Sequence, residues 1–225
     1  MDALFLTLKL AFISTFILLI ISTPIAWGLA HKQFKGKYLV EAIIALPLVL
    51  PPTVLGFYLL IALGPDGPGG WIASLWGDRT LAFSFTGLVI GSVIYSLPFV
   101  VLPLQNGFTL IGSRPIQVAA TLRASFLDSF RHIILPLAKP AYITAATLGF
   151  AHTLGEFGVV LMIGGNIPNE TQVVSIAIFE HVETMNYGDA HLLSGILLGL
   201  SFILLTLVYR NRPNANSQSQ GSQLL

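Results

Sequence analysis

The chain has 225 residues, of which 54% are hydrophobic and only 9% charged, and its formal net charge is +1 at pH 7. A water-soluble domain carries about a quarter charged residues, so this chain is expected to lie in a lipid bilayer. The near-neutral charge argues against nucleic acid as a partner. The absence of cysteine excludes disulfides, thiol catalysis and cysteine-ligated metals.

Five apolar segments are long enough to cross a bilayer as helices, which takes about 20 residues each. They are residues 10–30, 42–64, 83–108, 140–162 and 192–209. We expect the first to be retained and not cleaved as a signal peptide, because it is too long and its positive cluster follows it. The sequence therefore predicts an all-α integral membrane protein with five transmembrane helices.

Positive charges are distributed unevenly between the two sides of the predicted membrane. One side carries Lys32, Lys35, Lys37, Arg114, Arg123, Arg131, Lys139, Arg210 and Arg212. On the other side the loop 65–79 has only Arg79, and the loop 164–191 has no lysine or arginine. Because cationic loops face the cytoplasm, the N-terminus is predicted outside and the C-terminus inside. Residues 4–209 are expected to form one membrane domain, and the polar residues 210–225 a disordered cytoplasmic tail.

The segment 115–140, PIQVAATLRASFLDSFRHIILPLAKP, concentrates charge in a chain that otherwise avoids it. Pro115 suits the first turn of a helix, and the residues that follow place Ile116 and Ala119 on one apolar face. A second helix is predicted from residue 125 to 134, ending at Leu135-Pro136 because the residue before a proline disfavours the α conformation. The segment is predicted to be a cytoplasmic helix-turn-helix, either a coupling element or an interfacial connector.

This loop resembles the coupling motif of ATP-binding-cassette importer permeases, in which Glu-Ala-Ala precedes a glycine and, further along, Leu-Pro. The matching residues are Gln117, Val118, Ala119, Arg123, Ala124, Ser125, Leu135 and Pro136. Gln117, Val118 and Arg123 depart from the motif. If the bend needs a left-handed residue, an arginine in place of the glycine costs about 1 kcal/mol or more. The resemblance implies that the loop sits in a groove of a cytoplasmic ATPase, and we expect Ala119 to contact that groove.

Two further segments, residues 46–70 and 153–172, are similar to the permease subunits of molybdate importers. The similarity covers nearly the whole chain, but sulfate importer permeases share features of the second segment. The resemblance implies import of molybdate and tungstate, with sulfate or thiosulfate as the alternative cargo. It further implies a homodimer, two copies of the ATPase, an extracytoplasmic molybdate-binding protein and a bacterial inner membrane. No G-x-x-x-x-G-K-[ST] loop is present, so this chain is expected to bind no cofactor.

A path for a dianion through these spans is expected to offer only hydroxyls, amides and backbone N–H groups. Lysines occur in or beside the spans only near their margins, as Lys9 and Lys139, where the side chains can snorkel to the interface. Prolines inside the spans break helical hydrogen bonds, which membranes tolerate where the backbone faces protein or a cavity. The candidate path and gate residues are Pro51, Pro52, Thr53, Ser92, Ser96, Gln105, Asn106, Thr144 and Thr147.

Glu156 is the one acid deep inside a predicted span. A carboxylate lining an anion path would repel the cargo, so we expect it to be buried and structural. His152 lies one turn earlier and is an available hydrogen-bond partner. No catalytic residue and no metal site are predicted, which leaves a membrane-embedded enzyme or an autonomous anion channel as weaker alternatives. Residues 173–180 have helical spacing and predict a short outer helix, as a docking face, a lid or a connector.

Overall fold

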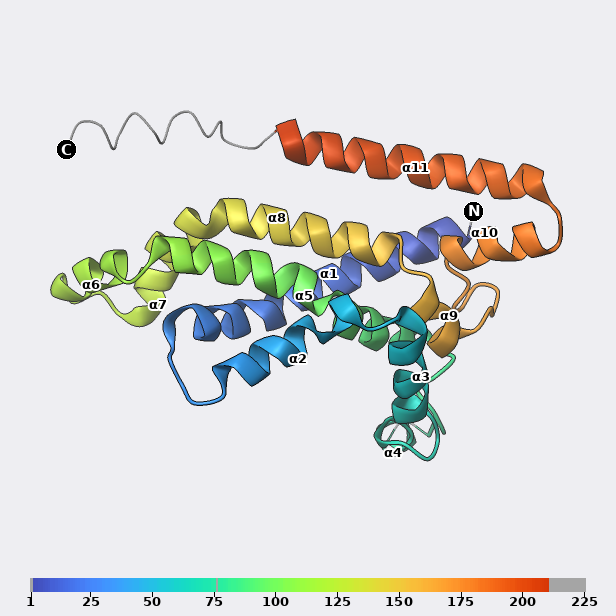
Figure 1. Cartoon of the computed structure of the whole chain (residues 1–225), viewed down its shortest axis with the longest axis horizontal. Helices are drawn as coiled ribbons and strands as arrows, with labels where there is room; N and C mark the ends of the chain where they lie inside the picture. Colours follow the sequence, from blue (N-terminus) through green and yellow to red (C-terminus); the bar gives the residue numbers. More distant parts are fainter. Residues whose placement is uncertain (1, 76, 211–225) are drawn as a thin grey trace.

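The computed structural model describes residues 2–75 and 77–210, which form a bundle of helices (Figure 1). The elements are α1 (Asp2–His31), α2 (Lys37–Val49), α3 (Pro52–Leu63), α4 (Pro68–Ser74), α5 (Phe85–Ile111), α6 (Arg114–Thr121), α7 (Phe126–Ser129), the π-helix η1 (Phe130–Ile134), α8 (Leu135–Leu154), α9 (Gly158–Gly164), α10 (Val174–Glu183) and α11 (Tyr187–Arg210).

Helices α1, α5 and α8 pack against one another and form the centre of the molecule (Figure 1). Small residues allow the close approach of α5 and α8. A Cβ built on Gly149 would lie 2.6 Å from Cγ2 of Val100, and one on Gly107 would lie 2.3 Å from Cβ of Ala141. Close packing of this kind holds helices together in lipid, where there is little hydrophobic driving force between them.

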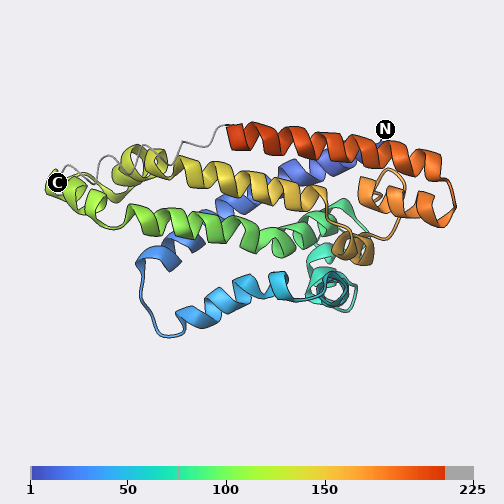
Figure 2. The same cartoon turned by 45° about the horizontal axis from the view of Figure 1, so that its top comes forward.

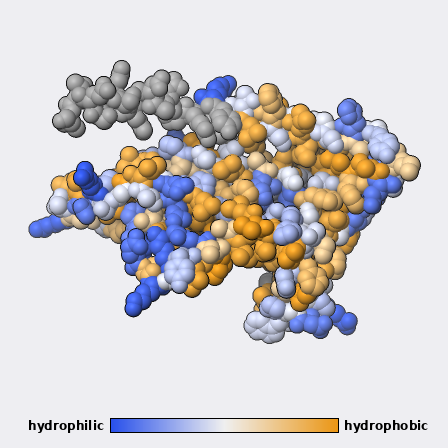
Figure 3. Space-filling model, in the orientation of Figure 1, coloured by the Kyte–Doolittle hydropathy of each residue, from blue (hydrophilic) through white to orange (hydrophobic). Residues whose placement is uncertain are grey.

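Helix α11 lies along α8 (Figure 2) and is the least buried of the long helices. Leu197, Leu200 and Leu204 pack beside the buried Phe150. The remaining side of the helix is apolar and exposed, as at Phe202, which suits contact with lipid tails. In Figure 3 the middle of the visible face is mainly hydrophobic, and hydrophilic residues gather at the end that holds α6 and α7.

The described residues hold four helical stretches that could each span a membrane, or five if a bent pair of helices counts as one span. Four helical stretches are long and apolar enough to span alone: Asp2–His31, Phe85–Ile111, Phe126–Leu154 and Tyr187–Thr206. The pair α2 and α3 meets at an angle of 112° and forms either a broken span or a re-entrant loop. The predicted single helix over residues 42–64 is therefore wrong in detail. Leu50 and Pro51 are extended, because Pro51 disfavours helix at Leu50 and neither Pro51 nor Pro52 can donate a backbone hydrogen bond.

The predicted span 140–162 is also broken. Helix α8 ends at Leu154, and α9 begins at Gly158 after a short connection. The two breaks lie side by side, since a Cβ on Gly158 would lie 2.7 Å from Cβ of Pro52. One helical turn further along α3, a Cβ on Gly56 would lie 2.8 Å from Cβ of Met162. Glycine at these positions thus lets α3 and α9 pack closely.

The predicted helix end at Leu135-Pro136 is wrong, because the chain stays helical from Phe126 to Leu154. A π-helical turn at η1 lets the helix continue past Pro136. The N–H of Leu135 bonds to the carbonyl of Phe130, five residues back, and Pro136 falls in the first turn of α8, where its missing donor is tolerated. The helix predicted over residues 173–180 is confirmed as α10, Val174–Glu183.

Candidate functional site

Helix α6 places one side against the bundle and the other in the open. Ala119 is only 2% exposed and Ile116 packs against the central core. Val118 and Leu122 are 61% and 78% exposed. The expectation that Ala119 faces a partner's groove is therefore wrong, because its side chain already packs inside this chain. The apolar side chains of this helix that remain exposed are those of the nearby residues Val118 and Leu122.

The bend between α6 and α7 is made by Arg123, which has a left-handed backbone with φ of 58°. The N–H of Arg123 bonds to the carbonyl of Ala120 at 3.0 Å, and that of Ala124 bonds to the carbonyl of Ala119 at 3.1 Å. This paired arrangement is a Schellman motif, a helix end at which glycine is the usual left-handed residue. Arginine has a Cβ that makes the same conformation strained.

The next helical stretch begins at Ser125 and is capped by it. The Ser125 hydroxyl accepts a hydrogen bond from the N–H of Asp128 at 3.2 Å and donates one to the Asp128 carboxylate. Such an N-cap satisfies backbone donors that a helix start leaves free. Leu135 and Pro136 lie beyond η1 at the start of α8, and Leu135, like Gln117, is exposed. The coupling-motif residues thus form one continuous segment at one end of the bundle.

The candidate path residues fall into separate environments. Asn106 and Thr144 line a cavity of about 780 Å³ between α5 and α8, close to α6. Pro52 and Thr53 line another of about 600 Å³ at the two helix breaks, together with Tyr95, His152 and Glu156. Thr147 lies instead on a small apolar groove beside α11. The structure of one chain thus places these residues in three separate environments and not in one channel.

Two of the candidate serines are completely buried. The hydroxyl of Ser96 lies 2.9 Å from Nδ1 of His152 and 3.2 Å from the hydroxyl of Thr153. The hydroxyl of Ser92 has no hydrogen-bond partner among the described residues. Both side chains are therefore enclosed in the packing of α5 and α8.

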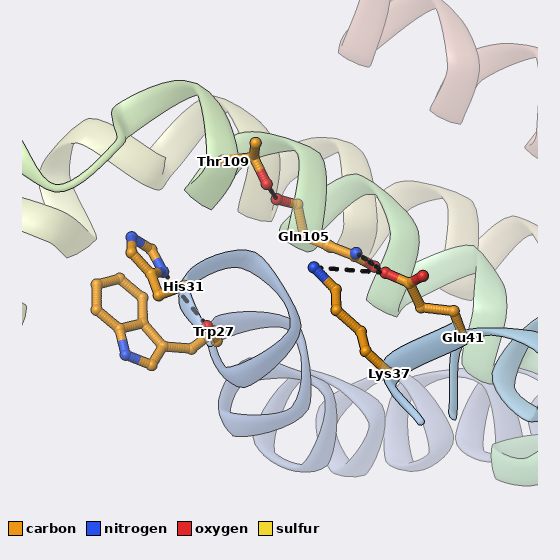
Figure 4. Close-up of polar contacts among 6 residues, drawn as sticks. All are labelled: Trp27, His31, Lys37, Glu41, Gln105 and Thr109. Atoms are coloured by element: carbon orange, nitrogen blue, oxygen red, sulfur yellow. Dashed lines mark hydrogen bonds and ion pairs between the residues drawn. The ribbon is translucent and has the colours of Figure 1, made fainter. Parts of the chain in front are cut away.

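Gln105 belongs to a polar group that ties α2 to α5 (Figure 4). Its amide donates to a carboxylate oxygen of Glu41 at 2.8 Å, and Lys37 lies 3.9 Å from the same oxygen. The group lies next to the first turns of α2. Sequence inspection did not single out Glu41, because it stands at the margin of the span, where charges are common.

Glu156 lies in the connection between α8 and α9 and is 5% exposed. Neither of its carboxylate oxygens forms a hydrogen bond with the described residues, although the Ser92 hydroxyl, which also lacks a partner, lies close to the carboxyl. The expected bond to His152 is not formed, because that ring bonds to Ser96 and stacks on Phe99 with a centroid distance of 3.9 Å. In the described part of the chain no group of three or more metal-binding side chains comes together.

These features define the class of the protein: a multi-pass membrane component of a transport system, with broken spans inside and an amphipathic loop at one end. A family model described as binding-protein-dependent transport system inner membrane component matches residues 22–211. The chain belongs to this family. It is thus a translocation subunit and not an enzyme.

The chain is 57% identical over 210 residues to the molybdenum transport system permease protein ModB of Azotobacter vinelandii, covering 93% of each protein. It is 37% identical over 208 residues to the same-named protein of Haemophilus influenzae, covering 91% of each. It is 33% identical over 199 residues to the sulfate transport system permease protein CysT of Salmonella typhimurium, covering 88% of this chain and 72% of that one.

Among solved structures, the fold matches a bacterial ABC transporter involved in the import of the acidic polysaccharide alginate. The TM-score is 0.70 at 18% identity, covering 97% of this chain and 78% of the other. A second structure of an alginate transporter, in complex with its periplasmic protein, matches with a TM-score of 0.72 at 16% identity, covering 92% and 76%. At such low identity the likeness establishes the fold alone. The resemblance to importer permeases seen in the sequence is confirmed by the family match.

Proposed function

We propose that this chain forms the membrane pathway of an ATP-driven importer of molybdate in a bacterial inner membrane. The observation that supports molybdate as the cargo is the 57% identity to a molybdenum permease over 93% of both chains, against 33% for a sulfate permease. Tungstate, a tetrahedral dianion of the same shape, is expected to share the path. Energy comes from a separate ATPase subunit.

The loop of α6, α7 and η1 faces the cytoplasm in this proposal, because Arg114, Arg123 and Arg131 gather there and positive loops remain inside. Its exposed apolar side chains include Val118, Leu122 and Leu127, at 61%, 78% and 72% exposed, besides Phe126 at 60%. Burying them in a groove of the ATPase removes apolar surface from water at about 25 cal/mol per Å². These residues, and not Ala119, are the proposed docking surface.

The path itself is expected to bind the dianion weakly. Neither of the described cavities, at Asn106 and at Thr53, has a lysine or arginine in its lining, although the second also contains Glu156. A cation buried there would hold the cargo tightly and slow its release. Selectivity then rests with an extracytoplasmic binding protein that delivers molybdate. Two copies of the chain, each with its own ATPase, are proposed to enclose the complete path between them.

Uptake of molybdate into vesicles containing the purified permease, the ATPase and the binding protein tests this proposal. Uptake is expected to require ATP and all three proteins. Excess tungstate is expected to compete strongly and excess sulfate weakly. Molybdate entry without the ATPase would favour an autonomous channel, and stronger competition by sulfate would favour a sulfate permease.

A further inference from the structure

Helix α1 is distant in sequence from the loop of α6, α7 and η1, yet the two are joined by a cluster of rings around Trp27. The Trp27 ring lies edge-on to Phe126 of α7 at 5.9 Å and to Phe130 of η1 at 5.6 Å between centroids. It also lies 5.2 Å from Phe108 of α5. His31 stacks on its other side at 3.9 Å and is seen beside Trp27 in Figure 4. One side chain thus joins α1 to α7 and η1, two of the three helical parts of the loop.

The cluster continues from the loop into the bundle. Phe108 is completely buried, and its ring lies 6.1 Å from that of Tyr142 on α8. The Tyr142 hydroxyl is 2.9 Å from the hydroxyl of Thr23, which returns the contact to α1 one turn before Trp27. A closely packed interior of this kind passes on a displacement and does not absorb it.

The opposite end of α1 is joined to the outer helix α10. Thr7 is only 2% exposed. Its hydroxyl accepts a hydrogen bond from the backbone N–H of Val174, the first residue of α10, at 2.8 Å. The same hydroxyl donates to the carbonyl of Ala3 at 2.7 Å, so both of its roles are filled. Between Thr7 and Trp27 the helix rises about 30 Å, the thickness of a bilayer core.

We propose that α1 is the element that communicates between the outer surface and the ATPase-facing loop, with Thr7 and Trp27 as its two positioning residues. A delivery protein that engages the outer side at α10 displaces α1 through the Thr7–Val174 bond. The displaced helix moves Phe126 and Phe130 through Trp27, and so changes the loop that the ATPase holds. The inference rests on the proposed function, and it specifies how docking outside regulates hydrolysis inside.

The test measures how far molybdate-loaded binding protein stimulates ATP hydrolysis by the assembled complex in vesicles. Thr7→Val keeps the shape of the side chain and removes the hydroxyl, and Trp27→Leu keeps an apolar residue and removes the ring. Each is expected to lower the stimulation about threefold to tenfold, as mutations along a coupling network do, with assembly and unstimulated hydrolysis retained. Phe16→Leu is the matched control, because Phe16 lies between the two on α1 and is 65% exposed.

A double-variant cycle separates communication from local packing. If Thr7 and Trp27 act through the same helix, the double variant loses no more stimulation than the worse single variant. Full stimulation in both single variants, or losses that simply multiply in the double variant, would overturn the proposal. If Trp27→Leu does not assemble, the cycle is run with Trp27→Phe and judged by the same rule. A failure of unaltered complexes to take up molybdate would instead overturn the proposed function.

Discussion

Arg123 occupies a left-handed position, with φ of 58°, that a glycine would fill without strain. For a residue with a Cβ this conformation costs about 1–2 kcal/mol. Glycine removes that cost but loses about 0.5–1 kcal/mol of extra chain entropy on folding. Arg123→Gly is therefore expected to stabilise the bend by about 0.7 kcal/mol, which corresponds to roughly a threefold shift in the local opening equilibrium.

Hydrogen exchange of the isolated permease in detergent measures this effect directly. The amides to follow are those of residue 123 and Ala124, which close the bend by bonding to Ala120 and Ala119. After correction for intrinsic rates, both are expected to exchange about threefold more slowly in Arg123→Gly. Arg123→Ala is the control, since it removes the guanidinium and keeps the Cβ and hence the strain. Unchanged or faster exchange in the glycine variant, or equal slowing in the alanine variant, would refute the strain argument.

Three further predictions follow from the same geometry. Val118→Glu places a charge on the exposed side of α6 and is expected to cost several kcal/mol of ATPase docking, seen as loss of the ATPase on co-purification; retained binding would contradict the docking surface. Glu156→Leu replaces a buried carboxyl that forms no hydrogen bond with the described residues. It is expected to raise the free energy of unfolding of the complex by about 1–3 kcal/mol, seen as a higher melting temperature; a lower melting temperature would show that the acid is paired in the assembly. Reporter fusions after residues 36, 70, 120, 175 and 215 should read inside, outside, inside, outside and inside, and an outer reading at 120 would remove the coupling role.

The four long apolar helices could be predicted from the sequence because a bilayer requires a minimum apolar length. Proline also marked the segment that breaks, at residues 50–52. The 112° angle between α2 and α3 could not be predicted. It depends on where α3 packs after the break, and that is set by contacts of Gly56 and Pro52 with α9, which are distant in sequence.

The role of α1 was hidden from sequence analysis for a related reason. The helix is apolar on every side, so its hydrophobic pattern does not indicate which residues face protein and which face lipid. Thr7 and Trp27 are ordinary residues at the margins of a membrane helix, where threonine and tryptophan are common. Only the contacts with Val174, Phe126 and Phe130 distinguish them.

Helix α6 shows why hydrophobicity alone could not locate the partner surface. It has apolar residues on two sides: Ile116 and Ala119 face the bundle, and Val118 and Leu122 are exposed. Before folding, both sides are equally suited to be buried, and the sequence does not say which is buried by this chain and which by another. The packing shows which side is which. Ala119→Glu would disturb the contact between the loop and its own bundle, whereas a charge at the exposed Val118 would act on the binding of the partner alone.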